Sequence, residues 1–147
     1  MARFLQTEIR IHATPQRVWD VLSDFARLGE WSPFFKSIEG KPQKGERLVV
    51  RFRKGPTFKP RVIEADAPRV LEWLGRLLIP GLFDGRHRFE LRAEGANTRL
   101  LHTERFTGLL VPLFGKALDK TEQDFAAFNA ALKSRAEGGT DTPRDGA

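Results

Sequence analysis

The sequence predicts an α+β fold in which a curved antiparallel sheet of about seven strands surrounds a long C-terminal helix. Alternating apolar and polar residues recur at short spacing from residue 36 to residue 107, with turn residues between the runs. Residues 111–136 instead place apolar side chains at three- and four-residue steps. Because such a helix must bury its apolar stripe against the sheet, we expect a cavity between the two.

The N-terminal elements follow from local signals. Residues 4–12 alternate, with Leu5, Ile9 and Ile11 on one side, which predicts a strand. Thr14 followed by Pro15 is typical of a helix N-cap and first helical residue, and this helix should end near Asp24. A second short helix is expected over residues 25–29. Proline at position 33 then predicts a turn over residues 30–35 with exposed aromatic side chains.

The remaining elements are expected at residues 36–39, 46–54, 58–64, 70–77, 84–93 and 98–107 as strands and 111–136 as a helix. Gly55-Pro56 marks a hairpin turn between the second and third of these strands. The tail, residues 137–147, is rich in Gly, Thr, Asp and Pro and is predicted to be disordered. The sequence therefore predicts one domain over residues 1–136.

Composition excludes several classes of site. The absence of cysteine excludes disulfides, thiolate metal sites and cysteine nucleophiles. Twelve Phe and three Trp with no Tyr give aromatic contact area without phenol donors. No apolar run approaches the roughly 20 residues of a transmembrane helix, and no signal peptide is recognisable, so a cytoplasmic location is expected.

The charge distribution argues against a nucleic-acid site. The chain has a net charge of +6, but its 25 basic residues are dispersed and form no recognisable nucleic-acid module. We therefore expect a basic, solvated surface and no nucleic-acid partner. Peripheral contact with an anionic membrane stays open, and the sequence specifies no oligomeric state.

The last two strands carry a polar trio on an apolar face. A turn centred on Gly95-Ala96 pairs Glu94 with Asn97, which sets His87 opposite Glu104 and Phe89 opposite His102. His87, His102 and Glu104 then share a face with Phe89, Leu91, Leu100 and Phe106. Buried polar groups need partners or a ligand, so this face is expected to line a cavity.

Several interpretations of the trio stay open. Glu104 could accept a hydrogen bond from His87 while the imidazoles contact a ligand carbonyl or hydroxyl. The pair could instead fix the register of the hairpin, or the trio could be catalytic acid and base groups. Two histidines and a carboxylate could also bind iron or zinc, although strand pairs rarely supply the ordered surroundings of such sites. No metal and no cofactor are predicted.

The order of elements resembles the helix-grip fold of the START and birch-pollen-allergen (SRPBCC) superfamily, and in particular its bacterial polyketide cyclase/dehydrase-like proteins. The resemblance covers residues 3–134 and implies a fold more specifically than an activity. The residues that carry it are Thr14-Pro15, Val18-Trp19, Leu22-Ser-Asp24-Phe25, Trp31-Ser-Pro33-Phe34, Leu71, Trp73, Gly81-Leu-Phe-Asp-Gly85-Arg-His87-Arg-Phe89 and His102-Thr-Glu104-Arg-Phe106-Thr-Gly108.

The predicted function is binding of an apolar, aromatic or lipid-like small molecule between the sheet and the C-terminal helix. One alternative is a cyclase/dehydratase-type enzyme that uses His87, His102 and Glu104 without a cofactor. Another is an interaction protein that offers its apolar loops to a protein or membrane. Loop residues Trp31, Phe34 and Phe83 are expected either to fold back as a lid, which we favour, or to pack locally as plugs. The loops that hold Trp31 and Phe34 and residues 78–83 should rim one opening. The expected ligand-binding residues are Trp31, Phe34, Phe52, Trp73, Phe83, His87, Phe89, His102, Glu104, Phe106 and Phe114.

Overall fold

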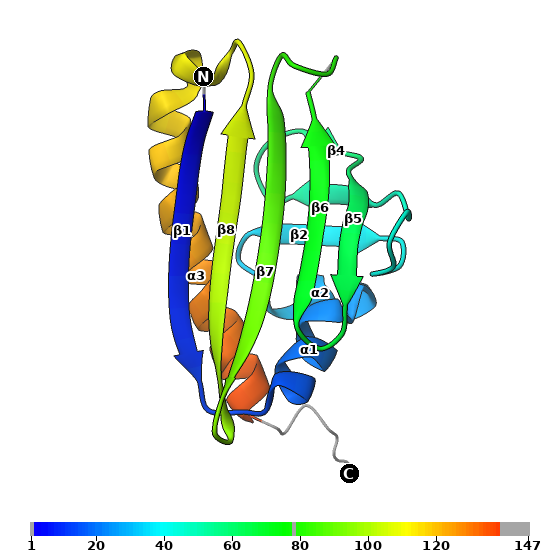
Figure 1. Ribbon diagram of the computed structural model, residues 1–147, viewed down its shortest axis with the longest axis vertical. Coiled ribbons are helices and arrows are strands. Elements are labelled where there is room, and N and C mark those ends of the chain that lie inside the picture. The colour runs from blue at the N-terminus through cyan, green and yellow to red at the C-terminus, as the bar shows by residue number, and fades with distance from the viewer. Residues whose placement is uncertain (1, 78, 139–147) are drawn as a thin grey trace.

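Two antiparallel sheets and a long helix make up the computed structural model, which describes residues 2–77 and 79–138. The larger sheet has the order β1-β8-β7-β6-β5, and the smaller has the order β2-β3-β4. Figure 1 shows α3 behind β1 and β8, and β2 running across the strands of the larger sheet. The elements are β1 (Ala2–Ile11), α1 (Pro15–Ser23), η1 (Phe25–Arg27), α2 (Leu28–Trp31), β2 (Phe35–Glu39), β3 (Val49–Phe52), β4 (Thr57–Phe58), β5 (Arg61–Asp66), β6 (Val70–Arg76), β7 (Asp84–Glu94), β8 (Asn97–Thr107), η2 (Val111–Phe114) and α3 (Gly115–Gly138).

The predicted helix-grip architecture is confirmed, with the strands divided between two sheets. The strand predicted over residues 58–64 is split into β4 and β5 at Pro60, which has no N–H to donate to a ladder. The sheets stay joined nearby, because Leu48 N donates to Pro60 O at 2.8 Å and Val62 N donates to Glu46 O at 2.8 Å. The result is a strongly curved surface that closes around α3.

The segment between α1 and β2 differs from the prediction. The helix start is confirmed, since the Thr14 hydroxyl accepts from Arg17 N at 3.2 Å and Pro15 is the first helical residue. The second helix reaches Trp31 rather than residue 29. The expectation that the turn exposes its aromatic residues is wrong for Phe35, which begins β2 and is fully buried.

Ser32 is the physical reason for this difference. Its hydroxyl accepts hydrogen bonds from Phe34 N at 3.1 Å and from Phe35 N at 2.8 Å. These bonds reverse the chain within two residues and turn Phe35 inwards, where its ring lies 5.5 Å from that of Phe128.

The C-terminal helix places its apolar stripe against the concave side of the sheets, as predicted. Leu118, Phe125, Phe128 and Leu132 are all buried. The helix also runs two residues beyond the predicted boundary at residue 136. Glu137, predicted to lie in a disordered tail, accepts from His12 N at 2.6 Å and from Lys133 Nζ at 2.5 Å, which extends the last turn. Residues 139–147 of the predicted tail lie outside the described residues.

The predicted register of the last hairpin is confirmed at each pair. Glu94 pairs with Asn97, Phe89 with His102, and His87 with Glu104. Phe89, Leu91, Leu100 and Phe106 are accordingly buried on one face. A slip by one residue would have placed the β7 pair and the β8 pair on opposite faces of the sheet, with one pair exposed to solvent.

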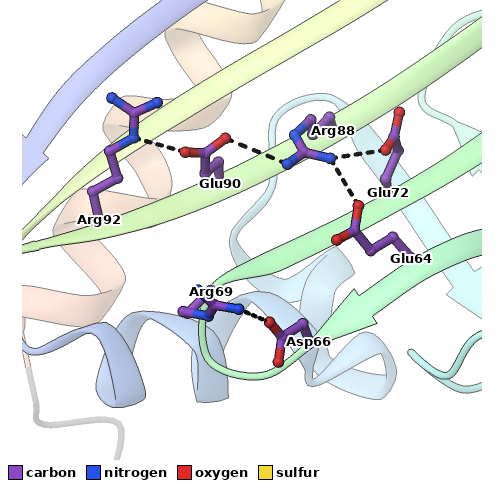
Figure 2. Close-up of polar contacts among 7 residues, drawn as sticks. All are labelled: Glu64, Asp66, Arg69, Glu72, Arg88, Glu90 and Arg92. Atoms are coloured by element: carbon purple, nitrogen blue, oxygen red, sulfur yellow. Dashed lines mark hydrogen bonds and ion pairs between the residues drawn. The ribbon is translucent and has the colours of Figure 1, made fainter.

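Charged side chains cover the opposite, convex face of the larger sheet. Figure 2 shows Arg88 on β7 paired with both Glu72 on β6 and Glu64 on β5, at 2.9 and 3.0 Å. Arg92 contacts Glu90 at 2.7 Å and thereby holds the pKa of that carboxyl below its ordinary value. This face is solvated, so the alternate side chains of the same strands point to the interior.

Candidate functional site

A cavity of about 370 Å³ lies between the two sheets, α3 and the loops at one end of the molecule. This volume is within the range of small-molecule sites in proteins. Its walls are mostly apolar and aromatic. They are formed by Phe34, Val50, Phe52, Lys54, Pro56, Phe58, Pro60, Trp73, Gly75, Leu77, Phe83, Gly85, His87, Glu104, Phe106, Phe114, Ala117, Leu118, Thr121 and Asp124.

Two facing glycines open the floor of this cavity. Gly75 on β6 pairs with Gly85 on β7, so neither strand contributes a side chain there. A Cβ on Gly85 would overlap Oε2 of Glu104, whereas a Cβ on Gly75 would lie 3.7 Å from the Cβ of Pro60. Gly85 therefore makes room for the Glu104 carboxylate, and Gly75 makes room for a guest.

His87 and Glu104 form the polar part of the floor. Nδ1 of His87 lies 3.0 Å from Oε1 of Glu104, as the predicted cross-strand pairing requires. The imidazole of His87 stacks on Trp73 with ring centroids 5.0 Å apart, which fixes its plane. His87 is 3% exposed, so its hydrogen bonds must be made to other protein groups or to a guest.

His102 lies behind His87 and is completely buried. Its Nε2 is 2.6 Å from Nε2 of His87, and its Nδ1 is 2.8 Å from Oδ1 of Asn129 on α3. Nδ2 of Asn129 donates to the Thr7 hydroxyl on β1 at 2.8 Å, and this hydroxyl donates to the carbonyl of His102 at 3.2 Å. A continuous hydrogen-bonded chain thus joins Glu104 at the cavity to Thr7 at the first strand.

Burial holds the pKa of His102 well below its ordinary value, and the neighbouring His87 lowers it further. The hydrogen bond with Asn129 opposes this shift but is the smallest of the three causes. The ring stacks almost parallel on Phe125, with centroids 4.1 Å apart at 11°. An imidazole enclosed in this way is neutral at physiological pH.

The cavity brings together eight of the eleven residues predicted to contact a ligand. The lining includes Phe34, Phe52, Trp73, Phe83, His87, Glu104, Phe106 and Phe114. Three predicted residues lie outside it. Trp31 packs against Phe128 at 5.2 Å, Phe89 is buried in the core, and His102 lies behind His87. The pattern of alternation gave the face of Phe89 and His102 correctly, but not their depth. Trp31 was expected in a loop and instead ends α2.

Two loops at one end of the molecule form the rim. Leu77 and Phe83 from the β6–β7 loop and Phe114 from the segment after β8 all line the cavity. Leu109 N donates to Gly81 O at 3.2 Å and Leu110 N to Leu82 O at 3.0 Å, so the loops support each other. Phe34 lines the same cavity but Trp31 does not, and Leu78, predicted for this rim, lies outside the described residues.

The trio is not arranged to bind a metal. Nε2 of His87 and Nε2 of His102 face one another in a hydrogen bond, so their lone pairs do not converge with the Glu104 carboxylate on one point. Within residues 2–77 and 79–138, no group of three His, Cys, Asp or Glu residues has metal-binding geometry.

Sequence reasoning missed Asn129 and Thr7. Asn129 lies four residues after Phe125 and three before Leu132, within the apolar stripe of α3. Thr7 lies between Leu5 and Ile9 on the inward face of the first strand. A polar residue on an apolar face identified the His and Glu trio, and the same signal could have identified these two residues.

The whole described chain corresponds to a known protein family. Residues 3–137 match the family model described as polyketide cyclase / dehydrase and lipid transport. The chain therefore belongs to this family, and the predicted resemblance to the START and birch-pollen-allergen superfamily is confirmed. Comparison with curated proteins gives no match.

Solved structures share the fold at low sequence identity. The Zhui aromatase/cyclase from Streptomyces sp. R1128 is 20% identical, with a TM-score of 0.75 over 100% of both chains. Protein MLL2253 from Mesorhizobium loti is 20% identical, with a TM-score of 0.75 over 95% of this chain and 99% of that one. Norcoclaurine synthase from Thalictrum flavum is 16% identical, with a TM-score of 0.70 over 93% and 87%.

Proposed function

We propose that the protein binds an apolar small molecule, aromatic or lipid-like, in the cavity between α3 and the sheets. The observation that carries this proposal is an aromatic cavity of about 370 Å³ whose floor holds one polar pair, His87 and Glu104. Apolar walls supply most of the binding free energy of such a guest, and a few polar groups set its orientation. Membership of a family described by cyclase, dehydrase and lipid transport functions supports the same class of ligand.

Native mass spectrometry of freshly purified protein tests this proposal. A co-purifying apolar molecule should appear as a protein species of higher mass and disappear in the denatured spectrum. If the protein emerges without a guest, titration with 2-methoxynaphthalene, an apolar naphthalene ether, should give saturable binding with one site. Failure to bind both a natural guest and this probe would contradict the proposal.

A catalytic function is the second candidate, and the shared hydrogen bond between His87 and Glu104 favours it. A pair that holds a proton at the cavity wall could transfer it to or from a bound guest. His102 could act only through His87, because it has no exposed surface. If the reaction is a dehydration, the guest that co-purifies with wild-type protein should be lighter by one water than the guest of Glu104→Leu. Identical masses would contradict a dehydration that depends on Glu104.

Interaction with an apolar surface is a third candidate, favoured by the exposed side chains beside the cavity rim. Ile79, Leu109 and Leu113 are 62%, 79% and 76% exposed, far more than leucine and isoleucine usually are. Ile79 lies in the β6–β7 loop, and Leu109 and Leu113 lie in the segment after β8, with Leu113 in η2; these two segments border the opening and are hydrogen-bonded to each other. A lipid surface at this position would let an apolar guest enter without crossing water. Anionic vesicles should retain wild-type protein more than a variant with serine at all three positions, and equal retention would contradict this role.

None of the helices in residues 2–77 and 79–138 has both the length and the apolar character needed to cross a membrane. Contact with lipid would therefore involve the loop side chains rather than a spanning helix.

A further inference from the structure

The hydrogen-bonded chain behind the cavity fixes where its protons lie. The carbonyl of His102 can only accept, so the Thr7 hydroxyl at 3.2 Å must donate to it. The same hydroxyl oxygen then accepts from the neighbouring amide of Asn129, which must present Nδ2 at 2.8 Å. This orientation turns Oδ1 of Asn129 towards Nδ1 of His102, also at 2.8 Å. Because Oδ1 can only accept, His102 carries its proton on Nδ1.

The next link is the contact between the two imidazoles. His102 is neutral and already holds a proton on Nδ1, so its Nε2 is a lone pair. Nε2 of His87 lies 2.6 Å away, and a hydrogen bond at this distance needs one proton between the two nitrogens. That proton must belong to His87. His87 therefore uses Nε2–H inside the protein and presents only Nδ1 to Glu104.

One proton is shared between Nδ1 of His87 and Oε1 of Glu104, at 3.0 Å. With no proton, two acceptors would face one another in an apolar site. With two protons, an imidazolium would face a neutral carboxylic acid and would have no counter-charge. Both arrangements are costly. The single proton sits either on His87, which gives an imidazolium–carboxylate pair, or on Oε1, which gives a neutral pair. In both states Oε2 of Glu104 carries no proton.

We propose that the cavity selects apolar guests that carry a hydrogen-bond donor, a hydroxyl or an N–H group, which they present to Oε2 of Glu104. This inference rests on the proposed binding function and names the chemical class of its ligand. Oε2 lies over Gly85, whose missing side chain leaves the oxygen open to the cavity. No hydrogen bond from the described residues reaches it, so a guest would supply its partner.

The surrounding polar groups agree with this assignment. Asp124 and Thr121, on the α3 wall of the cavity, add a carboxylate and a hydroxyl. The Thr121 hydroxyl donates its proton to Ala117 O at 2.9 Å, so both side chains offer acceptors to a guest. Lys54 also lines the cavity, but it lies in the exposed turn after β3 rather than at the floor. A guest with only a carbonyl or ether oxygen would set one acceptor against another at Glu104.

Three naphthalene probes of nearly equal shape test the proposal. These are 2-naphthol, which carries a donor, 2-methoxynaphthalene, which does not, and 2-acetylnaphthalene, which carries a carbonyl acceptor. Wild-type protein should bind 2-naphthol about tenfold more tightly than either of the others, a factor at the boundary between the net value of a neutral hydrogen bond and that of one to a charged group. Binding is measured from the quenching of tryptophan fluorescence or by calorimetry.

Two variants of Glu104 show whether this carboxylate causes the preference for 2-naphthol. Glu104→Leu should lower the preference clearly. It should bind 2-methoxynaphthalene no more weakly than wild type does, because the acceptor that faced the ether oxygen is gone, and this binding reports an intact cavity. Glu104→Gln should keep a reduced preference, because its amide N–H₂ would donate to Nδ1 of His87 and its carbonyl would face the guest. Gly85→Ala should displace Oε2 and lower the preference, whereas the matched change Gly75→Ala should not.

The possible outcomes separate the inference from the function on which it rests. Equal binding of the three probes by wild-type protein would overturn the donor inference and leave apolar binding intact. A preference for 2-acetylnaphthalene that Glu104→Leu removes would show that Oε2 is a donor and would also overturn it. Binding of none of the probes would contradict the proposed function and the inference together.

Discussion

At the scale of single residues, the site depends on side chains that never touch the cavity. Asn129 and Thr7 set the tautomer of His102, and His102 in turn sets that of His87. Glu104 is therefore the cavity-facing end of a chain of hydrogen bonds that runs through the core to β1. Fully satisfied buried networks of this kind make a core more specific, whereas a network with one missing member is costly.

Replacing Asn129 by leucine should expose that cost. The change leaves Nδ1–H of His102 without its acceptor in a fully buried position, so the free energy of unfolding should fall by about 1–3 kcal/mol. Urea unfolding followed by circular dichroism measures the loss. Gln123→Leu, an exposed amide on the same helix, is the matched control and should change stability by less than about 0.5 kcal/mol. Equal effects of the two changes would mean that the buried hydrogen bonds contribute nothing.

His102 should also make stability depend on pH. Its native pKa is well below 6.5, the ordinary value that it regains in the unfolded chain. The unfolded state therefore binds a proton below pH 6.5 that the native state does not, so stability is full above this pH and falls as the pH is lowered. The slope from one such group approaches about 1.4 kcal/mol per pH unit.

Unfolding at about pH 7.5 and about pH 5.5 in wild type and His102→Gln isolates this contribution, because all other titrating groups are common to both proteins. Wild type should lose more stability between the two pH values than the variant does. A variant with the same loss as wild type would mean that His102 binds a proton in the native state.

At the scale of elements, the central feature is the match between α3 and the concave face of the sheets. Phe125 contacts both the buried core and the cavity wall. Its ring stacks on that of His102, and its centroid lies 5.7 Å from the ring centroid of Phe34. The helix thus holds the floor of the cavity on one side and its rim on the other. Its apolar stripe determines both the stability of the fold and the position of the site.

Phe125→Ala should destabilise the protein by about 3–5 kcal/mol, the usual cost of removing a fully buried phenylalanine. Phe4→Ala is the matched control, because Phe4 is 56% exposed on β1. It should cost less than about 1 kcal/mol. Chemical denaturation gives both values, and a loss below about 1 kcal/mol for Phe125→Ala would remove this residue from the core.

Alternation and helical spacing predicted most of the elements because both signals are local. The turn at Gly95-Ala96 was enough to derive the pairing of His87 with Glu104. The predictions that failed concerned features that depend on tertiary packing. The depth of Trp31 and His102, the inward turn of Phe35 and the split at Pro60 follow from how the two sheets close around α3.

The cavity itself could be predicted only in outline. A polar trio on an apolar face indicated a lined space, and eight of the predicted residues do line it. Gly75 and Gly85 are paired and leave space at the floor of the cavity. Because glycine has no side chain, neither residue contributes to a pattern of apolar and polar positions. Their role depends on strand pairing across β6 and β7, which residue spacing alone did not specify.

At the scale of the whole molecule, the fold separates a charged convex surface from a mostly aromatic interior, in which His87 and Glu104 present polar atoms to the cavity. The arginine and glutamate pairs of the convex face keep the sheet solvated (Figure 2). The opposite face, α3 and the smaller sheet enclose space that their side chains do not fill. This arrangement is the physical basis for the claim that the protein is a binder of apolar molecules.

Filling the cavity tests that claim most directly. Gly75→Leu places a branched side chain in the space beside Pro60, and Ala126→Leu adds the same side chain on the exposed face of α3. Titration with 2-methoxynaphthalene, which has no hydrogen-bond donor for Glu104, should show saturable binding by wild type and by Ala126→Leu. Gly75→Leu should keep its fold by circular dichroism and bind the probe at least about tenfold more weakly, the loss expected when apolar contact area of this size is denied to a guest. Undiminished binding by folded Gly75→Leu would mean that the guest lies elsewhere and would contradict the account.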